Sequence, residues 1–232
     1  MLRAVIFDFN GVLVDDEPIH MEMFQKVLLE EGLSLDDREY YSLYLGMDDR
    51  SCFKAIFHNR GHVLSNTSLE KLIQCKAKYY RESIGNRIAV FPGVRKLVPE
   101  LFSHLPLAIG SGALRSEIDM ILESISLKNF FQVIVSAEDV REGKPSPETF
   151  AKALFLLNQM AAEKSIEPAE CLVIEDSKEG IRGARSAGMK CLAVANSHRA
   201  EELTEADAVV HSLEEVNMSF LKKQLFFADG PE

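Results

Sequence analysis

The stretch that most constrains this chain is residues 4–15, which read AVIFDFNGVLVD. Four apolar residues lead directly into Asp8, and Gly11 follows three positions later. A strand buried on both faces of a sheet reads as such an apolar run, and an acidic residue with a nearby glycine marks its end. An aspartate there is well placed to act as a nucleophile, and because a lone buried charge is costly it needs a partner such as a cation. The alternative is that Asp8 only starts a turn.

Short apolar runs alternate with helical patterns from Val90 onward. Strands are expected at residues 107–109, 133–135, 171–174, 191–194 and 208–210, with amphipathic segments between them. Strands that alternate with helices indicate crossover connections and a parallel sheet with helices on both faces. The sequence therefore predicts an α/β fold with a Rossmann-like parallel sheet.

Residues 17–86 follow a helical pattern throughout. A helix is expected from Pro18, which suits a first helical turn, to Gly32, which closes the segment. Capping-box spacing predicts that two further helices begin at Asp36 and Thr67. This insert has the size of a small helical bundle. The expected division is an α/β core of residues 1–16 and 87–232 and an all-α domain of residues 17–86.

The charge and cysteine patterns exclude several classes of function. The formal net charge is −10, whereas nucleic-acid phosphates select for basic surfaces, so we expect no nucleic-acid partner. A few local cations could still hold a small phosphorylated substrate. The four cysteines lie far apart without a C-x-x-C pair, which fits buried thiols in a reducing compartment. The apolar run before Asp8 is too short for a secretion signal or a membrane span. We expect a soluble cytoplasmic protein without a membrane partner, monomeric or weakly dimeric.

Polar residues that could take part in catalysis or ligand binding follow four of the apolar segments. Ligands of an open parallel sheet bind beyond the carboxyl ends of its strands. The residues expected there are Asp8 and Asn10, Ser111 with Gly110 and Gly112, Lys144, and Glu175 with Asp176. Carboxylates can hold Mg²⁺, a lysine can offset phosphate charge, and a hydroxyl can hydrogen-bond phosphate oxygens. This set suits phosphoryl transfer in which an aspartate forms an aspartyl phosphate.

Each of these residues also has a simpler interpretation. Lys144 could be a solvated loop lysine, and Ser111 could be an ordinary turn serine. Glu175 and Asp176 could favour the N-terminus of the following helix through its dipole. Any one of these simpler interpretations is plausible for its own residue. It is much rarer for such residues to follow four strands in this order by chance.

Four segments carry a resemblance to a known family. They are residues 8–12 (DFNGV), 109–112 (IGSG), 143–147 (GKPSP) and 174–177 (IEDS). They resemble the four motifs of the haloacid dehalogenase-like hydrolase superfamily, and the helical insert resembles its small α-helical cap. The most similar branch contains β-phosphoglucomutase and phosphoglycolate phosphatase. The motif set is specific for the superfamily and says little about the substrate.

The resemblance implies an Mg²⁺-dependent phosphatase that acts on a small phosphorylated metabolite such as a sugar phosphate. Asp8 would be the nucleophile and a metal ligand. The other metal ligands would be the backbone carbonyl of Asn10 and the side chains of Asp176 and Glu175. The phosphoryl group would be bound by Ser111, Gly112 and Lys144. In the cap, His20 and Arg50 match places where relatives contact the substrate, although His20 could equally be a hinge or packing histidine.

Asn10 departs from the family pattern, because the phosphatases and mutases carry an aspartate there as general acid and base. An amide cannot shuttle a proton at neutral pH, and such catalysis is typically worth ~10²–10⁴-fold, so hydrolysis of a poor leaving group should be slowed. Three hypotheses stay open. The protein is a phosphatase with another proton donor, for which His20 is one candidate; or Asn10 was introduced to trap a complex; or the chain binds metal and phosphate without turnover.

Three further activities fit less well. A β-phosphoglucomutase-like phosphotransferase must protonate sugar hydroxyls, which Asn10 makes harder. Dehalogenases and phosphonate hydrolases also lack the aspartate, but the acidic pair suits a metal, which disfavours a dehalogenase. Phosphonate hydrolysis requires a lysine in the cap that forms a Schiff base, and the cap lysines are expected at the surface. These are Lys54, Lys71, Lys76 and Lys78.

Overall fold

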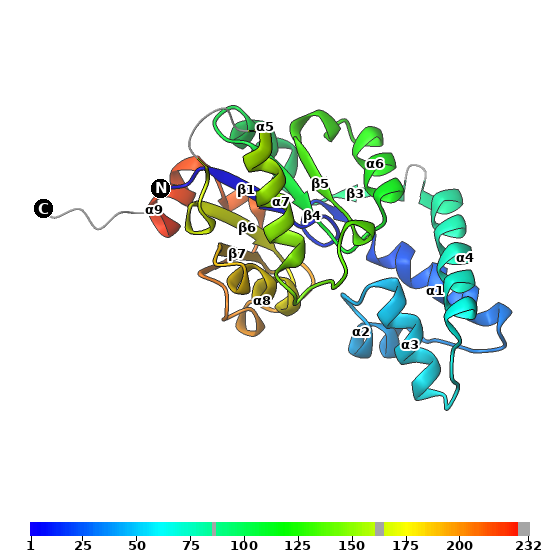
Figure 1. The fold of residues 1–232 in the computed structure, drawn as a ribbon. Helices are drawn as coiled ribbons and strands as arrows, with labels where there is room; N and C mark the ends of the chain where they lie inside the picture. The colour runs from blue at the N-terminus through cyan, green and yellow to red at the C-terminus, as the bar shows by residue number, and fades with distance from the viewer. Residues whose placement is uncertain (85–86, 161–164, 227–232) are drawn as a thin grey trace, which may run out of the picture. The chain divides into compact units, whose positions relative to one another are not determined.

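The computed structural model describes residues 1–84, 87–160 and 165–226. The chain forms two compact units, of which the larger comprises Met1–Asp15 with Ala89–Glu232 and the smaller comprises Asp16–Ile88 (Figure 1). The sequence placed the two junctions after residues 16 and 86, and the second position lies outside the described residues. The smaller unit is therefore inserted into the chain of the larger one.

The larger unit is built on a parallel sheet. In chain order its strands are β1 (Ala4–Phe7), β4 (Leu107–Gly110), β5 (Val133–Val135), β6 (Cys171–Glu175), β7 (Lys190–Val194) and β8 (Ala208–Val210). Their order across the sheet is β5-β4-β1-β6-β7-β8, so β1 lies between β4 and β6 (Figure 1). All residues of these three strands are buried, as expected for strands covered on both faces. The predicted α/β class with a Rossmann-like sheet is confirmed.

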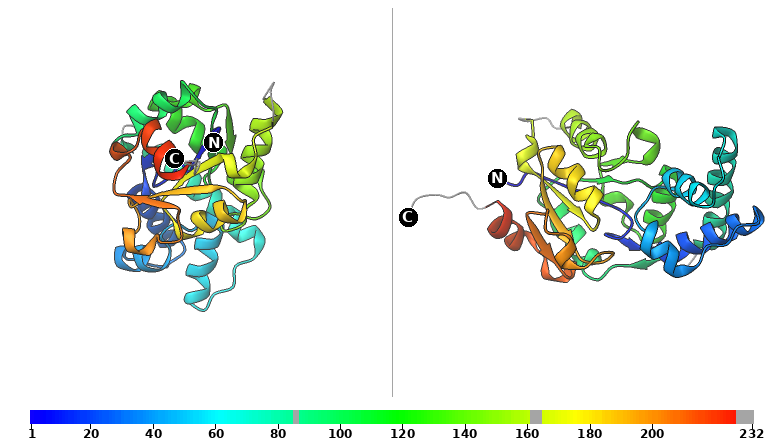
Figure 2. Two further views of the ribbon diagram at one scale, coloured as in Figure 1. Left: turned by 90° about the vertical axis from the view of Figure 1, so that its left-hand side faces the viewer. Right: turned by 90° about the horizontal axis from the view of Figure 1, so that it is seen from below.

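Helices lie on both sides of the sheet, and all but the last, which follows β8, precede a strand of the sheet (Figure 2). They are α5 (Val94–Phe102), α6 (Arg115–Ser124), α7 (Glu148–Met160), α8 (Lys178–Ser186) and α9 (Met218–Leu225). Single 3₁₀ turns occur at Lys128–Phe130, Ala137–Asp139, Pro168–Glu170, Ala200–Glu202 and Leu213–Glu215. A short antiparallel ribbon pairs β2 (Val14–Asp15) with β3 (Ala89–Val90), so the two segments that flank the smaller unit are joined.

The apolar core holds β1 from both faces. Ile6 belongs to a buried cluster with Phe150 of α7, on the face that α7 and α8 cover. Because successive strand residues point to opposite faces, Phe7 points the other way, and its ring packs edge-on against Phe131 with 5.9 Å between ring centroids. The end of β1 is thereby fixed, and Asp8 follows it directly.

The smaller unit consists of four helices over its described residues: α1 (Glu17–Glu30), α2 (Asp37–Leu43), α3 (Asp49–Asn59) and α4 (Asn66–Ile84). Asp36 caps α2 as predicted, accepting a hydrogen bond of 2.8 Å from the Glu39 backbone N–H. The helix predicted to begin at Thr67 is present as α4, which begins one residue earlier, at Asn66. The capping residue differs from the prediction, because the Ser65 hydroxyl accepts the Ser68 N–H at 3.1 Å.

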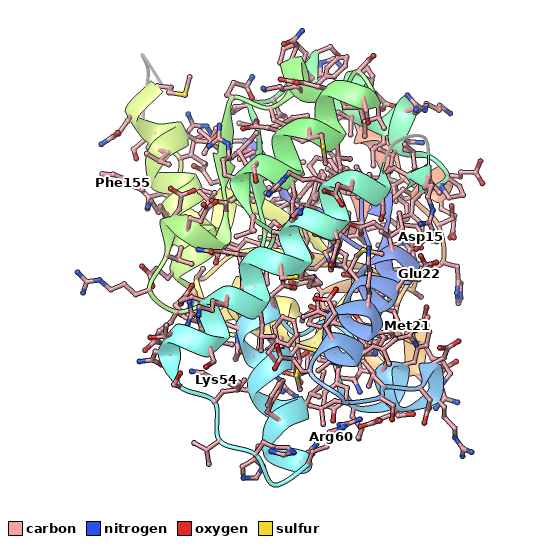
Figure 3. All side chains as sticks on the ribbon, turned by 90° about the vertical axis from the view of Figure 1, so that its right-hand side faces the viewer. Asp15, Met21, Glu22, Lys54, Arg60 and Phe155 are labelled. Atoms are coloured by element: carbon pink, nitrogen blue, oxygen red, sulfur yellow. The ribbon has the colours of Figure 1, made fainter. Side chains whose placement is uncertain are left out.

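Apolar side chains of these helices form their own core, which includes Phe24 of α1, Phe53 of α3 and Leu72 of α4. Arg60, which is labelled in Figure 3, follows α3. Its guanidinium binds both carboxylate oxygens of Glu39 at 3.0 and 2.9 Å and so ties the end of α3 to α2. Such a bidentate pair fixes geometry as well as adding binding energy. Among the described helices of both units, none is long and apolar enough to cross a membrane.

Candidate active site

Three acidic side chains and one lysine meet at the carboxyl ends of β1 and β6. Asp8 continues the sheet ladder through its backbone N–H, which donates to the Ile174 carbonyl at 2.9 Å. The Lys144 ammonium lies 2.7 Å from Oδ1 of Asp8 and 2.5 Å from Oε1 of Glu175. Asp176 completes the group, and one ligand oxygen from each of the three carboxylates lies within 4.8 Å of the others. The sequence predicted all four of these residues, and the fold brings them together.

The electrostatics of this cluster are dominated by burial. Burial raises the pKa of Asp8 to about 7, although the Lys144 ammonium pulls it down. Burial and the charges of Glu175 and Asp8 raise the pKa of Asp176 well above its ordinary value. Burial also acts to raise the pKa of Glu175, but Lys144 and hydrogen bonds from Ser177 outweigh it and leave that pKa lowered. Three buried carboxylates thus face the charge of one lysine, and their oxygens suit a divalent cation.

Glu175 is held at both of its oxygens. Oε1 pairs with Lys144, and Oε2 accepts the backbone N–H groups of Asp176 and Ser177, each at 2.8 Å, and the Ser177 hydroxyl at 2.9 Å. A Cβ at Gly180 would overlap the Glu175 carboxylate, so the first turn of α8 can pass this close only with glycine. Glu175 therefore has a fixed orientation, and it fixes that of Lys144.

The loop after β1 carries Asn10 and Gly11. Gly11 has a φ of 79°, in the left-handed region that favours glycine. A Cβ there would overlap the carboxylate of Asp176, so this loop and the one after β6 lie in direct contact. Asn10 is partly buried and pairs with Val14 in an isolated bridge.

Ser111 lies at the end of β4, the strand beside β1. It is buried, and its backbone N–H donates to the Val135 carbonyl at 2.9 Å. Its hydroxyl oxygen accepts the Ala113 N–H at 3.1 Å. Apart from Gly112 and its two chain neighbours, no described atom lies within 4 Å of the place where Gly112 would carry a Cβ, so the backbone there is open to close approach.

His20 and Arg50 belong to the smaller unit, and each pairs with other residues of that unit. The Nε2 atom of His20 lies 3.0 Å from Oδ2 of Asp16, and the Lys76 ammonium lies 2.7 Å from Nδ1. Burial and Lys76 lower the pKa of His20, but Asp16 outweighs them, and the pKa lies above its ordinary value. Arg50 pairs with Glu70 at the surface.

Lys76 corrects one expectation from the sequence. It was expected at the surface with the other lysines of the insert, yet it is 1% exposed. Its ammonium pairs with Asp49 and lies 4.3 Å from the centre of the Phe24 ring. Burial is possible because the charge is compensated on both sides by the Asp49 carboxylate and the aromatic face. Lys54, Lys71 and Lys78 are exposed as expected.

Sequence reasoning missed two residues next to the cluster, Asn196 and Ser197, in the loop after β7. The Asn196 side chain donates to the Gly11 carbonyl at 2.7 Å, and the Ser197 hydroxyl donates to Oδ2 of Asp176. The signal that could have found them is the rule that identified Asp8, since the expected strand at residues 191–194 also ends shortly before polar residues.

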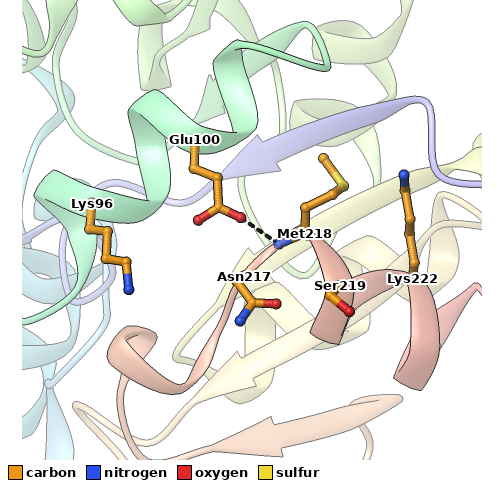
Figure 4. Close-up of a pocket in the computed structure, with 6 residues that line it drawn as sticks. All are labelled: Lys96, Glu100, Asn217, Met218, Ser219 and Lys222. Atoms are coloured by element: carbon orange, nitrogen blue, oxygen red, sulfur yellow. Dashed lines mark hydrogen bonds between the residues drawn. The ribbon is translucent and has the colours of Figure 1, made fainter.

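A pocket of about 610 Å³ lies elsewhere on the larger unit, between α5 and the start of α9 (Figure 4). Its residues are Lys96, Glu100, Asn217, Met218, Ser219 and Lys222. The Glu100 carboxylate accepts the Met218 backbone N–H at 2.9 Å. The pocket includes none of the acidic residues at the strand ends. We therefore place the candidate active site at the strand ends.

Comparison with known proteins agrees with this placement. A family model described as haloacid dehalogenase-like hydrolase matches residues 5–194, which include all four motif segments. The chain belongs to this family.

Its relatives in the family include named phosphatases. It is 30% identical over 95% of its length to the chloroplastic 5-amino-6-(5-phospho-D-ribitylamino)uracil phosphatase of Arabidopsis thaliana, of which it spans only 57%. It is 28% identical to the phosphorylated carbohydrates phosphatase of Thermotoga maritima, over 97% of this chain and 100% of the relative. The structure of β-phosphoglucomutase from Clostridium difficile matches with a TM-score of 0.85 at 24% identity, over 97% of this chain and 98% of that one, and confirms the fold.

Proposed function

We propose that this chain is an Mg²⁺-dependent phosphatase of a small phosphorylated metabolite, with sugar phosphates as the favoured class. The observation that carries the proposal is Asp8, buried at the end of the central strand, paired with Lys144 and flanked by Glu175 and Asp176. The names of the relatives support the reaction class, because they include a phosphatase of phosphorylated carbohydrates.

Asp8 is the nucleophile in this proposal. Its carboxylate oxygen attacks the phosphorus, and the bond from phosphorus to the ester oxygen breaks with its electron pair on that oxygen. Water then attacks the aspartyl phosphate and releases inorganic phosphate. Lys144 favours the ionised, attacking form of Asp8 by its charge at 2.7 Å, and it offsets charge on the phosphoryl oxygens. Ser111 and the open backbone at Gly112 would hydrogen-bond these oxygens.

The acidic cluster fits Mg²⁺, because its carboxylates outnumber the lysine that they face and offer oxygen ligands. Asp8, Asp176 and Glu175 would hold the ion together with the backbone carbonyl of Asn10. Bound there, Mg²⁺ supplies positive charge that offsets the charge of the phosphoryl group. Oε2 of Glu175 already accepts three hydrogen bonds, so Oε1, which pairs with Lys144, would be the oxygen that Glu175 offers to the ion.

The leaving ester oxygen needs a proton, which an amide at position 10 cannot deliver. Esters with acidic leaving groups do not need this proton, because their oxygen departs as a stable anion. We therefore propose that phosphoryl transfer to Asp8 is fast from such esters and slow from alkyl phosphates. His20, whose pKa is raised, stays a candidate donor, and Arg50 stays a candidate for contact with an anionic substrate.

The second candidate function is a metal- and phosphate-binding protein without turnover, and Asn10 is the observation that favours it. A mutase of the β-phosphoglucomutase type is a subordinate alternative. It would transfer the phosphoryl group from Asp8 to a second hydroxyl of the sugar instead of to water.

The test is phosphate release from p-nitrophenyl phosphate and a panel of sugar phosphates with Mg²⁺. It compares this chain with Asn10→Asp and Asp8→Ala. The proposal expects turnover of p-nitrophenyl phosphate by the chain itself, loss of this activity in Asp8→Ala, and a rise on sugar phosphates of about 10²–10⁴-fold in Asn10→Asp. If the chain is inactive on every ester and only Asn10→Asp turns over, the silent binder is the better account.

A further inference from the structure

Two consecutive residues of the loop after β7 contact both loops that carry the acidic cluster. The Asn196 amide reaches the Gly11 carbonyl at 2.7 Å, next to Asn10 in the loop after β1. The Ser197 hydroxyl reaches Oδ2 of Asp176 in the loop after β6. A single short segment is thus bonded to each of the two loops that hold carboxylates of the cluster.

The segment itself is anchored to the sheet. The Ala195 backbone N–H donates to the Val210 carbonyl of β8 at 2.9 Å, and the Asn196 N–H donates to the Val194 carbonyl of β7 at 2.9 Å. Because β7 pairs with β6, with Ala193 opposite Glu175, this anchor is only one strand away from the cluster. The two side chains therefore extend from a rigid base.

The hydrogen bonds of Ser197 and Asn196 both reach groups whose orientation determines the geometry of the acidic cluster. A hydrogen bond to Oδ2 fixes the rotation of the Asp176 carboxylate, and hence the direction in which Oδ1 points. The Gly11 carbonyl belongs to the tight turn that packs against this same carboxylate, where even a Cβ would overlap it. Asn196 thus holds one side of the contact between the loops, and Ser197 holds the other.

We propose that Asn196 and Ser197 are positioning residues of the metal site, with Ser197 orienting Asp176 and Asn196 holding the turn that presents the Asn10 carbonyl. The inference rests on the proposed function, because it assumes that these groups bind Mg²⁺. Groups that hydrogen-bond to metal ligands orient them, and their loss typically lowers metal affinity or activity ~10–100-fold. Neither residue needs to contact the substrate.

The experiment measures Mg²⁺ binding directly, by isothermal titration calorimetry without substrate. The variants are Ser197→Ala, Asn196→Ala and the conservative Ser197→Thr, which keeps the hydroxyl. Two control variants remove similar bonds elsewhere in the larger unit. Ser103→Ala loses a hydroxyl bond of 2.7 Å to the Glu100 carbonyl. Asn158→Ala loses an amide bond of 3.0 Å to the Ile166 carbonyl and the bond of 2.8 Å that its amide oxygen accepts from the Ile166 N–H. Thermal unfolding in EDTA reports the stability of each variant separately.

The inference expects the Kd for Mg²⁺ to rise about 10-fold or more in Ser197→Ala and in Asn196→Ala. Ser197→Thr and both controls should bind as the unaltered chain does, even where Asn158→Ala lowers the unfolding temperature. Unchanged Mg²⁺ affinity in Ser197→Ala and Asn196→Ala would overturn the inference and leave the proposed function standing. If Ser197→Ala does not fold, the Asn196→Ala titration decides alone. A chain that binds no Mg²⁺ before any substitution contradicts the proposed metal site, and the inference with it.

Discussion

Replacement of Lys144 by methionine should destabilise the metal-free protein more than the loss of any surface lysine. Lys144→Met keeps the length of the side chain but removes the ammonium that pairs with Asp8 at 2.7 Å and with Glu175 at 2.5 Å. Both carboxylates are buried, and removing one partner of a buried ion pair typically costs about 3–5 kcal/mol of unfolding free energy. At about 2–4 °C per kcal/mol for a chain of this size, the unfolding temperature should fall by roughly 6–20 °C.

The stability that Lys144→Met loses should also increase with pH. Lys144 lowers the pKa of Asp8 and of Glu175, so its removal raises both. Carboxyls whose pKa is higher in the folded than in the unfolded state cost stability as the pH rises through these values. The difference between Lys144→Met and the unaltered chain should therefore be largest near pH 8 and shrink toward pH 5.

The assay is urea and thermal unfolding in EDTA, followed by circular dichroism at several pH values. Lys178→Met is the matched control, because Lys178 pairs with Glu202 at 3.1 Å with both side chains about one-third exposed. Exposed pairs of this kind contribute about 0–1 kcal/mol. If Lys144→Met is no more destabilising than Lys178→Met, or if its deficit grows toward low pH, the account of the buried cluster is wrong.

Three further predictions follow from the same structure. The pKa of Asp8 is raised to about 7, and that of Asp176 is raised well above its ordinary value. The metal-free protein should therefore become more stable as pH falls from 8 to 5.5, by up to about 1.4 kcal/mol per pH unit and group, and an unfolding temperature in EDTA that stays flat would contradict this. Gly11→Ala should weaken Mg²⁺ binding and activity by at least about tenfold, because the added Cβ would overlap the Asp176 carboxylate. Its control is Gly32→Ala, which has a similar φ of 73° and space for a Cβ and should therefore cost only backbone strain. Equal Mg²⁺ affinities of the two variants would refute the contact with Asp176. Phe53→Ala, at a fully buried site of the smaller unit, should cost about 3–5 kcal/mol of unfolding free energy, and a loss below 1 kcal/mol in urea unfolding would show that this core is misplaced.

The positions of Asp8, Ser111, Glu175 and Asp176 were predictable because the sheet constrains them. A parallel sheet aligns the carboxyl ends of its strands, so residues that follow short apolar runs come together whatever the rest of the chain does. Lys144 follows no strand directly, and the sequence placed it at this edge as a lysine between Gly143 and Pro145, in a loop before a capped helix.

Other features were not predictable because they depend on tertiary partners. The burial of Lys76 follows from Asp49 and the ring of Phe24, which lie on other helices. The roles of Asn196 and Ser197 follow from contacts to residues far away in the sequence, which no local pattern encodes. Helix starts also stayed uncertain by a residue, since Ser65 and Thr67 are both suitable for a cap and only the fold decides between them.

The central claim is that Asp8 carries the phosphoryl group. Its most direct test is peptide mass spectrometry of the protein after brief incubation with p-nitrophenyl phosphate and Mg²⁺, followed by acid quenching. Because Asn10 cannot activate the water that hydrolyses the intermediate, the account predicts that phosphate accumulates on Asp8, and that Asp8→Ala and Mg²⁺-free samples carry none. Turnover without phosphate on Asp8, or phosphate on another residue, would contradict it.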